Sequence, residues 1–136
     1  MTSVLTAERW VVGLLREDAT MQSLVAGRIY SGVVPQSAVY PFVLVQRVSS
    51  RTVMGVGTAV IMWDELVMVK GVDKAESYST LETIMNRVRG VLHGASGDVT
   101  NGIVIGCVEE RTIMYPEVVD GVQYRHLGIE FRVWTQ

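Results

Sequence analysis

The segment that most constrains the fold is 61–72, which is predicted to be a β-strand with large apolar side chains on both faces. Successive side chains of a strand point to opposite sides of a sheet. Trp63, Val67 and Val69 therefore share one face. The opposite face carries Met62, Leu66, Met68 and Val72. A sheet with one solvated face does not need this pattern, so both faces of the sheet are expected to be covered.

Helical and strand-like periodicities alternate along the rest of the chain. The predicted helices are 6–18 and 78–92, and the predicted strands are 42–48, 61–72, 103–114 and 124–134. Met21, Leu24 and Val25 either continue the first helix or form a second short turn before Gly27. Residues 116–123 are expected to connect the last two strands, with a turn at Asp120-Gly121.

The start of the second helix carries its own signal, because Asp73 and Glu76 have the spacing of a capping box. The element order predicts a single α+β domain over residues 1–136. Its sheet is expected to be four-stranded and antiparallel, with helices packed on one face and the order α-β-β-α-β-β.

The composition indicates more apolar surface than one small core needs. Hydrophobic residues make up 49% of the 136 residues and charged residues 19%, so part of the apolar surface is expected to face a partner. The formal net charge of −2 argues against tight binding to nucleic acid, which needs a basic excess. No apolar run approaches the length of a membrane span, and no signal-peptide pattern is visible, so we expect a soluble, intracellular protein when made.

Residues capable of catalysis are present but not in useful arrangements. Cys107 is the sole cysteine and is expected to be a buried small hydrophobe. His126 and Glu130 lie about 13 Å apart along one strand face. His93 ends the long helix, where it is expected to interact with the helix dipole. We therefore expect no enzymatic activity, no catalytic residues, no cofactor and no metal.

Surface apolarity supplies the candidate interface residues. The loop 52–59 joins two strands and carries Val53, Met54 and Val56 where polar residues are usual. It is either an arm that docks on a neighbour or a loop that folds back on its own sheet. Trp63, Tyr124 and Trp134 complete the candidate interface set. For Tyr124 and Trp134, packing against a helix of the same chain is the alternative.

The order of several segments resembles the tail-completion, or tail-terminator, family of long-tailed phages. The resemblance rests on a helix ending at Gly27-Arg28-Ile29-Tyr30, the Val33-Val34-Pro35 loop, Tyr40-Pro41-Phe42 opening the first long strand, the helix 78–92 and the final strand 124–133. It implies a homo-oligomeric ring, typically a hexamer, at the head-proximal end of the virion tail. Such a ring caps the tail tube and stops its polymerisation.

The implied partners are further copies of the chain, the major tail tube protein and a head-tail connector or stopper. DNA only passes through the channel, no membrane is involved, and assembly takes place in the host cytoplasm. An alternative within the same class is another head-tail joining protein, a stopper or adaptor. A second class is a small-molecule-binding α+β domain with a pocket lined by Trp63, Tyr78, His93 and Cys107.

Overall fold

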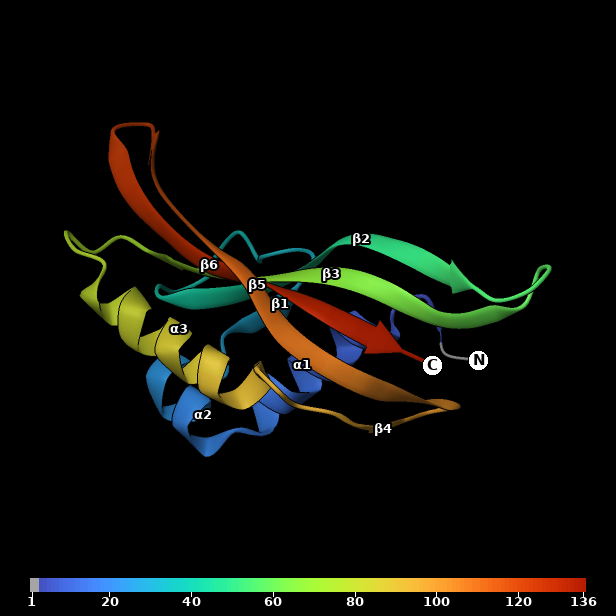
Figure 1. Ribbon diagram of the computed structural model, residues 1–136. Coiled ribbons are helices and arrows are strands. Elements are labelled where there is room, and N and C mark those ends of the chain that lie inside the picture. The colour runs from blue at the N-terminus through green and yellow to red at the C-terminus, as the bar shows by residue number, and fades with distance from the viewer. Residues whose placement is uncertain (1–2) are drawn as a thin grey trace.

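A computed structural model describes residues 3–136, which form one mixed sheet with three helices on one side of it (Figure 1). The elements in chain order are α1 Thr6–Glu17, α2 Ala19–Val25, β1 Ile29–Ser31, β2 Phe42–Met54, β3 Val60–Asp73, α3 Ser79–Leu92, β4 Gly97–Val99, β5 Gly102–Val119 and β6 Val122–Thr135. The sheet is strongly curled, and the β2–β3 turn and the β5–β6 hairpin tip lie on opposite sides of the view in Figure 1.

The sheet order is β1-β2-β3-β6-β5-β4, so the expected four-stranded sheet and α-β-β-α-β-β order are wrong in detail. The four predicted strands form its centre as β2, β3, β5 and β6. The missed strands, β1 and β4, have three residues each, too short for an alternation to be recognised. Because β1 pairs parallel with β2, the sheet is mixed rather than antiparallel.

The N-terminal helical region is split in two by Asp18. This residue ends α1 in an extended conformation and caps α2, because its Oδ2 accepts a hydrogen bond from Met21 N at 2.9 Å. Ala26 and Gly27 then adopt positive φ and end the helical region, as the glycine predicted.

The predicted capping box at Asp73 is wrong. Strand β3 continues to Asp73, which is still paired with Arg125 of β6. The Asp73 carboxylate accepts a hydrogen bond from the neighbouring Lys74 N at 2.8 Å. The α3 helix begins only at Ser79 and has no side-chain cap. Strand pairing therefore prevails over the local capping signal.

The hairpin of β5 and β6 is longer than expected, and the predicted connection 116–123 is wrong. Strand β5 runs to Val119 and β6 starts at Val122. Asp120 and Gly121 adopt φ of 50° and 78°, as a two-residue hairpin turn requires. Pro116 is tolerated in β5 because β4 pairs only with residues 102–104, and no other strand of the described residues pairs with this edge. The hairpin tip extends beyond the helices (Figure 1).

The hydrophobic core lies between the helices and one face of the sheet, which we call the covered face. Helices α1 and α3 contribute Val11, Leu15, Leu81, Ile84 and Val88; the sheet contributes Val67, Val69, Cys107, Ile129, Phe131 and Val133. Gly71 allows α3 to approach, because a Cβ there would lie 2.9 Å from Leu81 Cδ2. Cys107 is buried as predicted, and burial raises the pKa of its thiol to about 12.

Candidate assembly surface

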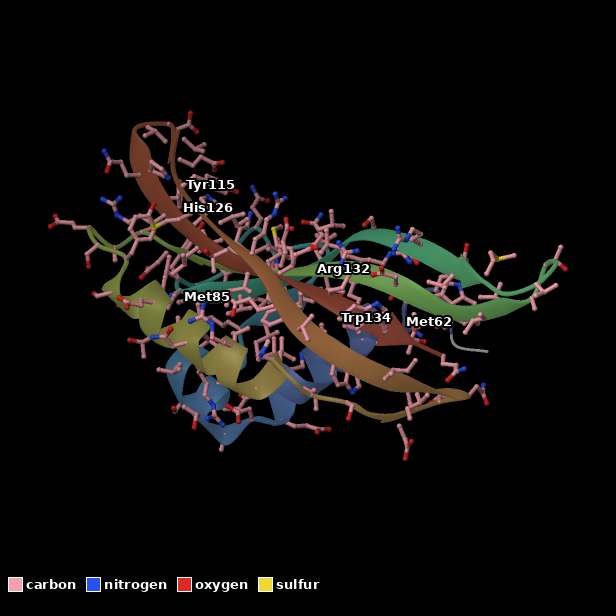
Figure 2. The ribbon with its side chains drawn as sticks, in the orientation of Figure 1. Met62, Met85, Tyr115, His126, Arg132 and Trp134 are labelled. Carbon is pink, nitrogen blue, oxygen red and sulfur yellow. The ribbon has the colours of Figure 1, made fainter. Side chains whose placement is uncertain are left out.

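The side of the sheet that faces away from the helices, which we call the open face, is crossed by ion pairs. Asp64 of β3 is only 6% exposed and accepts hydrogen bonds from Arg51 Nη2 and Arg132 Nη1, both at 3.0 Å. Arg132 also donates to Glu110 Oε1 at 2.7 Å. These pairs connect β2, β3, β6 and β5 across the sheet, and Figure 2 shows Arg132 in the middle of this face.

A second pair on the open face joins Arg111 to Glu130. Arg111 Nε and Nη2 donate to the two carboxylate oxygens at 2.7 and 3.0 Å. Leu66 and Met68, which pair with Arg132 and Glu130 of β6, are half-buried. The ion-paired side chains therefore cover part of the second apolar row of β3, which we expected to need a partner. The arginines and carboxylates of these pairs balance in charge.

At one end of the sheet, the turn 55–59 joins β2 to β3. We call this turn and the strand ends beside it, residues 54–61, the arm. Gly55 N donates to Ala59 O at 2.7 Å and closes the loop. Val56 at the tip is 99% exposed, and Met54 is 47% exposed. The predicted loop 52–59 is too long, because β2 continues to Met54 and pairs Val53 with Met62. Val53 is therefore a half-buried strand residue beside the arm. The arm therefore presents apolar side chains to solvent at its tip.

The candidate aromatic residues lie in different places. Trp134 is on the open face, opposite Asp64 and beside Gly106, where a Cβ would lie 3.7 Å from its ring. Figure 2 shows Trp134 and Met62 towards the arm end of the sheet. Trp63 pairs with Thr135 and so belongs to the covered face. Tyr124 lies near the β5–β6 hairpin tip. The structure thus does not gather the six candidates into one patch.

The other end of the open face contains a cavity of about 310 Å³, which we call the socket. It is lined by Val34, Tyr40, Phe42, Leu44, Lys70, Val72, Glu117, Val119, Tyr124 and His126. Strand register explains how it forms, because Phe42 pairs with Val72, Val72 with His126, and His126 with Tyr115. This row of apolar and aromatic groups crosses four strands.

Ring contacts hold the walls of the socket. Tyr40 lies 5.1 Å from Phe42 and 5.6 Å from Tyr124, measured between ring centroids. Lys74 Nζ lies 4.7 Å from the Tyr40 centroid, a cation-π contact at the rim. Burial, followed by the neighbouring Tyr124, raises the pKa of the Tyr40 hydroxyl. The Tyr40 hydroxyl is therefore neutral at physiological pH.

His126 is the unusual group in the socket. It is 7% exposed, and neither of its ring nitrogens has a hydrogen-bond partner in the described part of the chain. Its ring stacks on Tyr115 at 4.5 Å (Figure 2), and Glu117 Oε1 is 3.8 Å from Nε2, beyond hydrogen-bond range. Burial and the charge of Lys70 lower the pKa of His126, so the imidazole is neutral at pH 7.

Sequence reasoning missed the socket, because its residues come from a loop and from four strands, and the sequence does not give the register in which these strands pair. A partial signal was present in Tyr40-Pro41-Phe42, which opens β2 beside it. The alternative pocket of Trp63, Tyr78, His93 and Cys107 does not form. Trp63 and Tyr78 lie near opposite ends of β3.

The other two residues of that alternative pocket have structural positions. His93 caps α3, and its Nδ1 accepts a hydrogen bond from Glu109 N at 3.0 Å. Cys107 lies in the core. Within residues 3–136, no group of three or more His, Cys, Asp or Glu side chains is placed to hold a metal ion. No helix in the same range is long and apolar enough to cross a membrane.

In its sequence and its fold, the chain is similar to known components of virions. The model of a family described as "Tail completion protein gp17" matches residues 9–136. A similar solved structure is a chain from the "Virion of native gene transfer agent (GTA) particle". It has a TM-score of 0.74 and 19% identity, over 96% of this chain and 94% of that chain. No curated protein matches the sequence. At this identity, the structural likeness establishes the fold.

Proposed function

Because this chain belongs to the family of the tail completion protein gp17, we propose that it is the tail terminator of a phage-like particle. Membership of that family makes it a structural protein of the virion tail. In the proposal, a closed ring of copies, with six as the expected number, caps the head-proximal end of the tail tube. The ring stops polymerisation of the major tail tube protein and offers a surface to the head connector or stopper. The family match over residues 9–136 carries this proposal.

The two edges of the sheet support assembly into a ring. On one side, β1 pairs with β2 only at residues 43–45, so the outer edge of β2 beyond them has no neighbouring strand in residues 3–136. On the other side, β4 pairs with β5 only at residues 102–104, and the edge at 110–119 is equally open. Unpaired edges are sites of association. Because the two edges differ, contact between them is head-to-tail, which closes into rings or continues into filaments.

The charge distribution suits a ring through which DNA passes. The net charge is −2, and the arginines of the open face are paired with carboxylates. A surface without a basic excess does not displace counterions from phosphate groups and so does not hold DNA. DNA is thus a passing occupant of the proposed channel rather than a bound partner.

Polymerisation of the purified major tail tube protein tests the proposal directly. With this chain added, tubes are expected to stop growing and to carry a ring at one end in electron micrographs. Tubes that grow equally long with and without the chain, and that carry no ring, would contradict it. The alternative of a stopper or adaptor predicts instead that the chain co-purifies with DNA-filled heads and not with free tails.

A further inference from the structure

We propose that the socket is the docking site for the arm of a second copy of this chain. This inference rests on the proposed ring and identifies one contact within it. Each copy would insert the arm tip, around Val56, into the cavity around His126 of its neighbour. The socket would thereby be a receptor for an apolar loop, rather than a small-molecule site.

The two surfaces match in character. The chain carries no charged residue between Arg51 and Asp64, so the arm brings no charge that must be desolvated. The socket it enters is mostly aromatic and aliphatic, with Lys70, Glu117 and His126 as its polar members. Val56 exposes almost its whole side chain. The socket offers aromatic and aliphatic walls from Tyr40, Phe42 and Val119 and from the other residues given above. Burial of an exposed valine in such a site is favourable.

Geometry prevents a copy from filling its own socket. Phe42 at the socket and Met54 at the arm are the two ends of β2, and a strand of this length spans about 40 Å. The arm and socket thus lie at opposite ends of one sheet. The wide separation of the β2–β3 turn from the β5–β6 hairpin in Figure 1 also shows this. The only copy of the arm that can reach the socket belongs to another molecule, and the contact is head-to-tail.

His126 supplies the polar part of the recognition. Its two buried ring nitrogens have no hydrogen-bond partner among residues 3–136, and a buried polar group without a hydrogen bond is costly. The arm tip also offers backbone N–H and C=O groups to a partner. At Gly55 and Gly57 no side chain screens these groups. Gly57 has a φ of 73°, a conformation that favours glycine. A backbone group of the docked arm can therefore pair with the neutral imidazole.

Cysteine cross-linking tests the contact. We would combine Val56→Cys in the arm with Val119→Cys in the socket and oxidise the assembled protein. Val118→Cys is the matched control, because Val118 is the adjacent residue of β5 and points to the other face. The native Cys107 is buried in the core and is therefore not expected to form a cross-link.

The double variant Val56→Cys, Val119→Cys is expected to give a ladder of dimers, trimers and larger species on a denaturing gel. A mixture of the two single variants should stop at dimers, since each copy then carries only one accessible cysteine and can form only one disulfide bond. Val56→Cys combined with Val118→Cys should give no ladder. Equal ladders from Val118 and Val119, or bonds formed mainly between two copies of Val56→Cys, would overturn the docking site.

Failure of this contact can be told apart from failure of the proposed function. If the chain forms rings and caps tubes, but Val56→Cys and Val119→Cys do not cross-link, the socket assignment is wrong and the terminator stands. If the cross-links form but tubes are not capped, the contact stands and the terminator function is wrong. A small molecule retained by the unmodified chain in native mass spectrometry, and lost on Val119→Asp substitution, would also overturn the arm as occupant.

Discussion

The two faces of the sheet are built on different principles. On the covered face, Val67, Ile129 and Phe131 are almost completely buried against three helices. On the open face, ion pairs such as Asp64 with Arg132 cross the strands, and a cavity remains around His126. The covered face holds the subunit together, whereas the open face and the ends of the sheet are free to contact other molecules. Substitutions should therefore affect folding on one side and assembly on the other.

The largest effect on folding is expected from Phe131→Ala in the core. Phe131 is fully buried, and removal of its ring should lower the free energy of unfolding by about 3–5 kcal/mol. Val122→Ala, at an exposed position of β6 that pairs with Val119 on the open face, should change it by no more than about 0.5 kcal/mol. Urea unfolding followed by circular dichroism measures both. Similar losses for the two variants would remove the distinction between the faces.

A smaller loss is expected from Asp64→Asn on the open face. The change weakens hydrogen bonds from Arg51 and Arg132 to a buried carboxylate, and should cost about 1–3 kcal/mol. Glu109→Gln breaks the more exposed pair with Arg89 and should cost less than about 1 kcal/mol. If unfolding shows no difference between these variants, the ion pairs of the open face contribute no more than ordinary surface charges.

The socket should make stability depend on pH through His126. Burial lowers the pKa of His126 in the folded chain below its ordinary value of 6.5. The unfolded chain then binds more protons, so the stability present above about pH 6.5 is lost as the pH falls. His126→Gln should flatten the dependence of the melting temperature on pH between about 5 and 8. Parallel curves for the two proteins would show that His126 is not a buried neutral group.

The smallest effect is expected at Glu65, a buried acid on the covered face. Burial raises the pKa of Glu65, only partly offset by the hydrogen bond from Ser50 and the charge of Arg47. Its Oε2 has no hydrogen-bond partner in residues 3–136. The folded chain holds this proton more tightly, so its contribution to stability falls as the pH rises above the ordinary carboxyl pKa. Glu65→Gln should therefore stabilise the chain slightly at pH 7 in thermal melts; a lower melting temperature would contradict this.

The sequence predicted those parts of the molecule that depend on local periodicity. The α3 helix and strand β6 have long, regular apolar patterns, so their positions were predicted to within a few residues. The missed parts depend on contacts between distant segments. Strand β1 forms because it pairs with β2. Asp73 belongs to β3, rather than to a helix cap, because it pairs with Arg125 of β6. The socket requires Phe42, Val72 and His126 to be in register across three strands, which no local pattern reveals.

Native mass spectrometry of the purified chain, beside the arm variant Met54→Asp with Val56→Asp, tests the central claim most directly. Both residues are exposed, so the variant should fold with an unchanged circular dichroism spectrum. The wild-type chain is expected to give one closed oligomer and the variant mainly monomers, because burying two carboxylates against the aromatic and aliphatic walls of the socket, beside Glu117, carries a large desolvation and repulsion cost. A wild-type chain that is monomeric and does not bind tail tubes, or a variant that assembles equally well, would contradict the account.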